Sequence, residues 1–164
     1  MIRLTGEFLP SSFIVQGTDI WLAGNMAPVI TAGATATVDE NASDASLGAI
    51  TIADADGDAQ EVTLAATGGT FSLDVGQLAI VAGANDSASI TLKGGLSAIN
   101  TALTTLVFTP TPNLTGTGKA SLSVLTDDGQ GDDDIHTIVI DIADVKPEVA
   151  AQTFAVAENS ASGT

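Results

Sequence analysis

The feature of this sequence that most constrains its fold is a long internal repeat. The segment that begins at Pro28 has a proline, an apolar stretch and a Glu-Asn pair followed by small residues, and the segment that begins at Pro147 has the same features in the same order. The two Glu-Asn pairs begin at Glu40 and Glu158, which are 118 residues apart. Self-similarity at a fixed spacing is typical of tandem arrays, and this spacing is that of one ordinary domain. The chain is therefore predicted to contain one complete unit of such an array.

The repeat divides the chain into three predicted parts. Residues 26–146 form the complete unit, residues 147–164 are the truncated start of a following unit, and residues 1–25 are a flanking segment or the end of a preceding unit. The first part has two short apolar runs, at Phe13 and Ile20, that suggest a strand or two. The N-terminus lacks the apolar run of an ordinary signal peptide, and no stretch approaches the roughly 18 apolar residues of a membrane-spanning helix.

Short alternating runs of apolar and polar residues, separated by turn dipeptides such as Asp56-Gly57 and Asp128-Gly129, fill the unit. One segment has helical spacing, and Ser97 is predicted as its N-cap. Aromatic residues are only 4% of the chain, so the core must be built mostly from small aliphatic side chains. The pattern predicts an all-β fold, an immunoglobulin-like Greek-key β-sandwich with one short helix. Strands are expected at Ala34–Val38, Leu47–Ala53, Glu61–Ala66, Thr70–Leu73, Ser89–Leu92, Thr105–Thr109, Lys119–Thr126 and Thr137–Ile142.

The charge balance is extreme, with 20 Asp and Glu against 4 Lys and Arg and a formal net charge of −16. Such a chain repels nucleic-acid phosphates and anionic membranes, so no nucleic-acid partner and no membrane insertion are expected. The repulsion also destabilises a compact fold unless cations neutralise it. The chain has no cysteine, which excludes disulfides and thiolate chemistry.

Catalysis is not expected from this sequence. The single histidine, His136, lies in a predicted strand, and no second histidine or cysteine could complete a zinc site or a nucleophilic triad. Paired carboxylates could hydrolyse glycosides, but holding a sugar requires aromatic walls, and the chain has one Trp, no Tyr and 5 Phe.

The acidic residues gather at the ends of the predicted strands. Crowded carboxylates repel one another unless a divalent ion lies among them, and calcium takes carboxylate and carbonyl oxygens from flexible loops. Residues 132–134 fit a solvated hairpin tip better than a ligand set. The three groups are residues 54–58, residues 127–134, and Asp39 and Glu40 together with Asp141 and Asp144.

The order of these motifs resembles that of a cadherin-like tandem repeat, in the form found in large bacterial RTX-type adhesins secreted by the type I route. The resemblance covers about residues 25–159 and implies a cadherin-like sandwich with calcium ions between consecutive repeats. The matching segments are Asn25–Pro28, Val38–Ala42, Ile52–Gly57, Val124–Gly129 and Ile140–Pro147.

The resemblance also implies which residues bind the calcium ions. Asp54, Asp56 and Asp127 would serve the junction with the preceding unit. Glu40, Asp141 and Asp144 would serve the junction with the following unit.

The second set departs from the family pattern. Ala143, Val145 and Lys146 stand where polar residues are usual, and the middle of the unit has no Asp-x-Glu element. Calcium is therefore expected to bind weakly at that junction.

Three functions remain as hypotheses from the sequence. The first is a calcium-dependent spacer in a long extracellular protein of the bacterial cell surface, exported by a signal outside this sequence, with neighbouring repeats as its partners. The second is an adhesin module that binds a glycan or protein of a host or bacterial surface, with Trp21 at a recognition edge. The third is homophilic association through exposed sheet edges.

Overall fold

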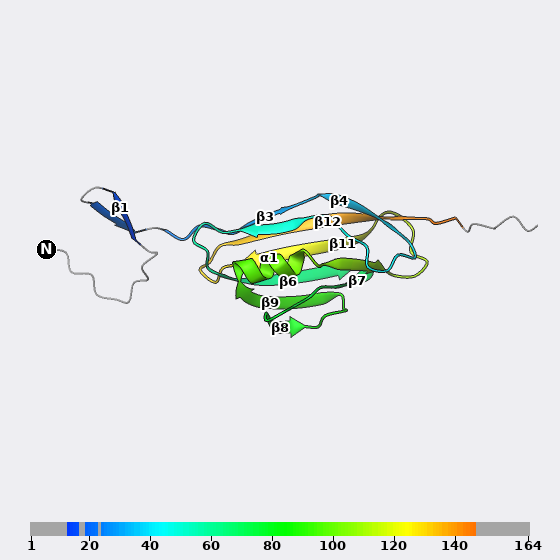
Figure 1. Ribbon diagram of the computed structural model, residues 1–164. Coiled ribbons are helices and arrows are strands. Elements are labelled where there is room, and N and C mark those ends of the chain that lie inside the picture. The colour runs from blue at the N-terminus through cyan, green and yellow to red at the C-terminus, as the bar shows by residue number, and fades with distance from the viewer. Residues whose placement is uncertain (1–12, 17–18, 23, 147–164) are drawn as a thin grey trace, which may run out of the picture.

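The computed structural model describes residues 13–16, 19–22 and 24–146 of the chain. Residues 24–146 contain a β-sandwich with one short helix, and residues 13–16 and 19–22 form a separate antiparallel pair of strands (Figure 1). This confirms the predicted all-β sandwich and its single helix. The predicted start of a following unit, at 147–164, lies outside the described residues. In chain order the elements are β1 (Phe13–Gln16), β2 (Asp19–Leu22), β3 (Val29–Ala32), β4 (Thr35–Asp39), β5 (Ile50–Ala53), β6 (Ala59–Thr67), β7 (Gly69–Ser72), β8 (Ala79–Gly83), β9 (Ser89–Gly95), α1 (Leu96–Leu103), β10 (Val107–Pro110), β11 (Gly116–Asp127) and β12 (Asp133–Ala143).

One layer of the sandwich is a six-stranded sheet in the order β4-β12-β11-β6-β9-β8. Its neighbours are antiparallel except β4 and β12, which are parallel. The parallel pair arises because the chain bends after β3, near Gly33, and continues as β4 in the other sheet. The longest strands, β11 and β12, have 12 and 11 residues, so the sandwich is about 40 Å long in the strand direction.

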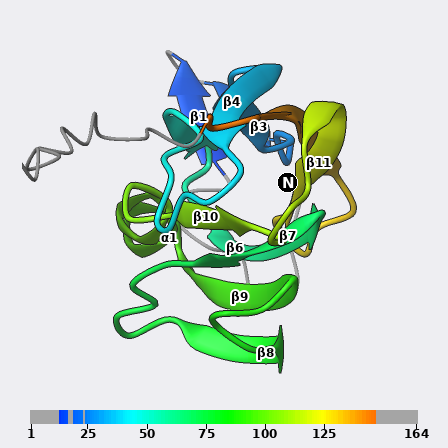
Figure 2. The same ribbon diagram turned by 90° about the vertical axis from the view of Figure 1, so that its right-hand side faces the viewer.

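The other layer is made of two short strand pairs and the helix. β3 pairs with β5, and β7 pairs with β10, while an isolated bridge joins Ala45 to Phe108. Helix α1 packs against β5, β9 and β6. Figure 2, which looks along the strands, shows these segments lying opposite the six-stranded sheet. In the part of the chain that the structure describes, no helix is long and apolar enough to cross a membrane.

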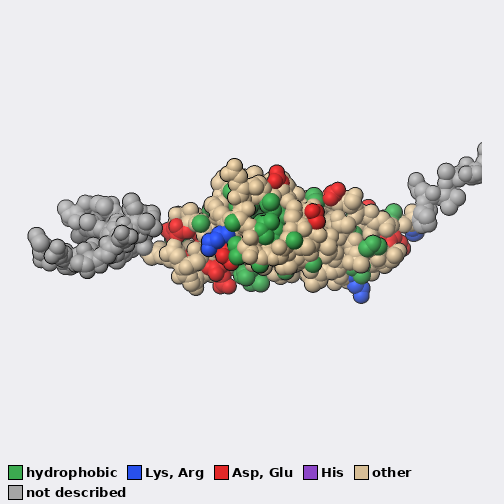
Figure 3. All heavy atoms as spheres, turned by 90° about the horizontal axis from the view of Figure 1, so that it is seen from below, with side chains coloured by type: hydrophobic (Ala, Val, Ile, Leu, Met, Phe, Trp, Pro, Cys, Tyr) green, Lys and Arg blue, Asp and Glu red, His purple; other side chains and the backbone are tan. Residues whose placement is uncertain are grey.

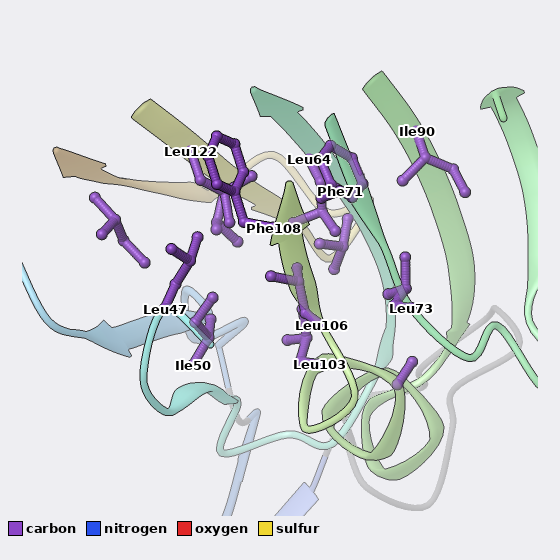
Figure 4. Close-up of a cluster of buried hydrophobic side chains, with 14 of the residues drawn as sticks. Leu47, Ile50, Leu64, Phe71, Leu73, Ile90, Leu103, Leu106, Phe108 and Leu122 are labelled. Carbon is purple, nitrogen blue, oxygen red and sulfur yellow. The ribbon is translucent and has the colours of Figure 1, made fainter. Parts of the chain in front are cut away.

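The core lies between the two layers and follows the alternation of the strands. On β11, Ala120, Leu122 and Val124 are buried while the residues between them are half-exposed. Phe71 and Phe108 pair directly across β7 and β10 and point toward the long sheet (Figure 4). Each side chain of this kind stabilises the fold by about 1.5–3 kcal/mol through burial alone.

The helix begins differently from the prediction. Its first residue is Leu96, and Gly95 occupies the N-cap position without a side-chain capping bond. The predicted cap at Ser97 is wrong, because β9 runs directly into the helix and Ser97 already lies inside it, where its carbonyl accepts a 2.8 Å bond from Thr101 Oγ1. The helix ends at Leu103.

Several strands also differ from the prediction. No strand is predicted at β3 or at β8, and the strand predicted from Leu47 begins three residues before β5 does. β8 was missed because all of its residues are exposed, so it lacks the alternation that marks a half-buried strand.

Two asparagine side chains form hydrogen bonds to strand backbone that a neighbouring strand would otherwise form. Asn100 on α1 accepts a 2.8 Å bond from the Ile52 amide and donates a 2.8 Å bond to the Ile52 carbonyl. Asn85 binds both backbone groups of Leu73 in the same way. Each amide satisfies a backbone donor and acceptor that would otherwise have no partner.

Candidate functional site

Three segments that are far apart in the sequence meet at the end of the sandwich where the chain enters it. They are the segment before β3, the loop between β5 and β6, and the loop between β11 and β12 (Figure 1). We call this end, made of residues 25–30, 54–60 and 126–134, the N-terminal pole. Figure 3 shows acidic side chains at this end of the sandwich, on the left of the view.

The first loop is organised by Asp54. Its Oδ1 accepts bonds of 2.9 and 3.3 Å from the amides of Asp56 and Gly57, which folds the loop back on itself. Its Oδ2 accepts a 2.6 Å bond from Nε2 of Gln60. The sequence singled out Asp54 as a ligand candidate, and the structure shows that it also fixes the shape of the loop.

Gln60 lies beneath this loop and is not among the residues predicted from the sequence. Its side chain is fully buried, and its Oε1 accepts a 2.8 Å bond from the buried Thr126. Its Nε2 also donates to the carbonyl of Asp58 at 3.4 Å. A glutamine inside an alternating strand resembles any other polar position, so only tertiary structure reveals that it faces the core.

The second loop is organised by its own carboxylates. Oδ1 of Asp127 accepts a 2.6 Å bond from the Gly129 amide, and Oδ1 of Asp128 accepts a 2.7 Å bond from the Gln130 amide. Asp128 is only 8% exposed, which is rare for a carboxylate. Nε2 of Gln130 donates to Oδ2 of Asp58, which ties the two loops together.

Carboxylates of both loops hold the incoming chain. Nδ2 of Asn25 donates to Asp128 at 2.8 Å and to Asp132 at 3.3 Å. The Met26 amide donates to Oδ2 of Asp56 at 2.7 Å. This segment therefore adopts a defined path across the N-terminal pole.

Asp134 holds the same stretch of chain one step further on. Its Oδ2 accepts a 2.7 Å bond from the Ile30 amide at the start of β3. Asp133 and Asp134 belong to β12, and the expectation that they form only a solvated hairpin tip is wrong for Asp134, because its carboxylate caps β3.

The side-chain oxygen of Asn25 has no partner at this pole. Asn25 Oδ1 is buried and accepts no hydrogen bond. Its Nδ2 faces two carboxylates, so the orientation of the amide is fixed and Oδ1 must point away from them. A buried carbonyl-type oxygen without a hydrogen-bond partner matches the donor chemistry of a calcium ligand.

The described residues do not, however, form a complete cation cage. Among them, no three His, Cys, Asp or Glu side chains are arranged to hold a metal ion. Asp54, Asp56 and Asp127 lie at the same pole, each accepting a bond from a backbone amide. An open, mostly polar hollow lies beside them and is lined by Asp127, Gly129, Gly131, Asp132 and Asp133.

The second predicted group lies at the opposite end of the sandwich, and its members are held by different segments. Oε1 of Glu40 accepts a 3.2 Å bond from the Val145 amide, and the Glu40 amide donates to the Ala143 carbonyl at 2.9 Å. Asp141 lies within β12, where its Oδ1 accepts a 2.7 Å bond from the Gly118 amide. Asp144 is exposed. We call this end, made of residues 39–41 and 141–146, the C-terminal pole.

His136 has a plain structural contact. Its Nε2 lies 3.1 Å from the Gly33 carbonyl, where β12 passes the bend between β3 and β4.

Comparison of the chain with protein-family models, with curated proteins and with solved structures finds no match in any of the three.

Proposed function

We propose that the chain is a calcium-dependent spacer unit of a tandem array in a long extracellular protein. The observation that carries the proposal is the convergence of two acidic loops on the incoming segment at Asn25 and Met26, at the end of the unit opposite to the one where the chain leaves (Figure 1). Units connected in this way follow one another end to end, so the direction of the strands becomes the direction of the array.

Charge supports a role for cations at the junctions. Two units that meet end to end bring the acidic N-terminal pole of one against the C-terminal pole of its neighbour, where Glu40 and Asp144 lie. With a formal net charge of −16 per chain, this contact is repulsive unless a cation lies within it. A bound calcium ion would supply that neutral bridge and would stiffen the joint.

The oxygen donors at the N-terminal pole are of the chemical kinds that calcium binds. Calcium prefers carboxylate and carbonyl oxygens. The pole offers the carboxylates of Asp54, Asp56 and Asp127 and the side-chain oxygen of Asn25, which accepts no hydrogen bond. Calcium takes about six to eight oxygens, more than this pole arranges by itself, so the remaining donors would come from the preceding unit. Within the chain, Gln60 and the loop amides donate hydrogen bonds that hold these carboxylates in place.

Thermal unfolding with and without calcium tests the proposal. We expect calcium to raise the Tm of the chain by several degrees above its value in EDTA, while magnesium at the same ionic strength has a smaller effect. The triple variant Asp54→Asn, Asp56→Asn, Asp127→Asn should lose the calcium response. The matched control is Asp86→Asn, at an exposed loop position with φ 55°, which should keep it. Equal Tm values in calcium and EDTA would refute the proposal.

Small-angle scattering on two consecutive units tests the mechanical part. We expect the pair to be extended in calcium and to show a smaller radius of gyration in EDTA, because the joint then bends freely. A radius of gyration that does not change on chelation would contradict stiffening by calcium, even if single units bind the ion.

A further inference from the structure

A pocket of about 350 Å³ lies between helix α1 and the loop that joins β7 to β8. One wall is formed by side chains three or four residues apart, which share one face of α1 and of the turn that follows it. The other wall is the loop itself, residues 74–78. This volume is near the lower limit for ligand pockets, so the pocket fits a small molecule. The helical wall consists of Ala98, Thr101, Ala102 and Thr105.

The fold itself holds the two walls together. The Asp74 amide donates a 2.8 Å hydrogen bond to Oγ1 of Thr105, which joins the loop to the end of the helix. Within the loop, the Gly76 amide donates a 3.0 Å bond to Oδ1 of Asp74. The Leu78 amide donates a 2.9 Å bond to the Val75 carbonyl. The pocket is therefore formed before a ligand binds, so that binding requires little ordering of the chain.

The floor of the pocket is apolar. Leu78 and Ala102 line it and are themselves buried. A Cβ at Gly94 on β9 would overlap the side chain of Leu78, so this glycine leaves the room that the leucine occupies. Val75, at the side, is half-buried. A ligand that covers this floor gains about 25 cal/mol for each Å² of apolar surface removed from water.

The polar groups that the fold fixes at the pocket are hydrogen-bond acceptors. Oγ1 of Thr105 donates its proton to the Ala102 carbonyl at 2.7 Å. Oγ1 of Thr101 donates its proton to the Ser97 carbonyl at 2.8 Å. A hydroxyl has one proton, so both oxygens can only accept further bonds. The Asp74 carboxylate, whose Oδ1 is bound within the loop, keeps Oδ2 as a third acceptor.

The charges around the pocket are negative. Asp74 is the one charged residue of the lining, and none of the four Lys and Arg residues of the chain belongs to it. The last turn of α1 adds the partial negative charge of a helix C-terminus. Gln77, the remaining polar side chain of the lining, is exposed and neutral. A positively charged ligand is therefore favoured over a neutral one, and an anion is disfavoured.

We infer that this pocket binds a small organic cation, namely a primary ammonium group on a short aliphatic chain. An ammonium has three N–H donors, and the pocket supplies three acceptors, which are Oδ2 of Asp74 and the hydroxyl oxygens of Thr101 and Thr105. The aliphatic chain of the ligand covers the apolar floor. The lining residues belong to neither pole of the sandwich, so this inference does not depend on calcium or on a tandem array.

Other cations fit the lining less well. A quaternary ammonium is recognised by aromatic walls and has no N–H donor, and no aromatic residue lines this pocket. A guanidinium binds best when it forms two parallel bonds to both oxygens of a carboxylate. At Asp74 one of these oxygens already accepts the Gly76 amide, so the ammonium is the better match.

Titration of the intact chain with pentylammonium, followed by two-dimensional amide NMR in EDTA, tests the inference. We expect saturable shifts of the amides of residues 74–78 and 98–105. Pentanol and pentyltrimethylammonium have the same apolar chain, and we expect each to bind about tenfold more weakly, because the first lacks the charge and the second lacks the N–H donors. Equal affinity for pentylammonium and pentanol, or shifts confined to other residues, would overturn the inference.

Two pairs of variants locate the site. Asp74→Asn should weaken pentylammonium binding about tenfold, whereas Asp44→Asn, which removes the same charge outside the pocket, should leave it unchanged. Ala98→Leu fills the pocket and should abolish binding, whereas Ser97→Leu, at an exposed position beside the pocket on the same helix, should not. Circular dichroism checks that each variant is folded. Unchanged binding by folded Asp74→Asn and Ala98→Leu would show that the amine does not occupy this pocket.

Discussion

Oε1 of Gln60 on β6 accepts a 2.8 Å hydrogen bond from Oγ1 of Thr126 on β11, and both side chains are fully buried. The same glutamine donates to Asp54 at 2.6 Å. The buried pair of Gln60 and Thr126 therefore holds Asp54, and with it the loop between β5 and β6, in place at the N-terminal pole.

Replacement of Gln60 tests how much these hydrogen bonds contribute to the stability of the fold. We expect Gln60→Leu to lower the free energy of unfolding by about 1–3 kcal/mol, because it leaves the hydroxyl of Thr126 and one oxygen of Asp54 without their partner. Urea denaturation measures the change. The double variant with Thr126→Val should regain part of the loss, since the orphaned hydroxyl is then gone. The exposed Gln77→Leu is the control and should change stability by no more than about 0.5 kcal/mol.

Asn100 gives a second stability prediction. Asn100→Leu removes both bonds to the backbone of Ile52, and we expect a loss of about 2–3 kcal/mol because the two backbone groups remain buried. Ser97→Ala serves as the comparison on the same helix. It should be nearly neutral, since Ser97 is not the N-cap; a loss of about 1 kcal/mol would show that it caps the helix after all.

A third prediction concerns the close approach of β7 and β10. A Cβ at Gly69 would overlap the buried ring of Phe108 and the carbonyl of Thr109. We therefore expect Gly69→Ala to destabilise the fold by about 1–3 kcal/mol, because neither the backbone nor the packed ring can move away. At Gly33 the nearest atom to a new Cβ is 3.5 Å away, so Gly33→Ala should have little effect. Thermal unfolding of the two variants side by side decides the matter.

The fourth prediction concerns Asn25 and depends on calcium. Asn25→Asp exchanges an amide that donates to Asp128 and Asp132 for a third carboxylate. In EDTA we expect the Tm to fall, because like charges then face one another. In calcium the loss should be much smaller, since a carboxylate is a good ligand for the ion.

The control for this variant is Asn113→Asp, which adds the same charge at an exposed turn with φ 61°. The change in Tm caused by Asn113→Asp should be the same in calcium and in EDTA. If the loss caused by Asn25→Asp were equally large in calcium and in EDTA, a cation at the N-terminal pole would be contradicted.

The success of the fold prediction has a simple cause. Alternation along β6, β11 and β12 is strong because one face of each strand is buried against the core, and this pattern is visible in the sequence itself. β8 breaks the rule, since it lies at the edge where the opposite layer no longer covers it. The N-cap error at Ser97 has a related origin: the end of β9 determines where the helix starts, and local cap preference does not.

The candidate site was only partly visible in the sequence. Spacing singled out Asp54, Asp56 and Asp127, because acids next to glycine turns at strand ends are a local pattern. Asn25 and Gln60 give no such signal, since an uncharged amide is common at the surface and its role depends on what it faces after folding. The wide separation in sequence between Asn25 and Asp128 likewise hides their contact.

By itself, the sequence determined the class of fold and the presence of acids at strand ends, because hydrophobic periodicity and turn chemistry are local properties of a chain. Only the tertiary structure decided which of those acids meet, which amides hold them and which strand is left at an open edge. The physical reason is that these relationships depend on the order of strands in the sheet, which is set by how the whole chain buries its apolar side chains at once.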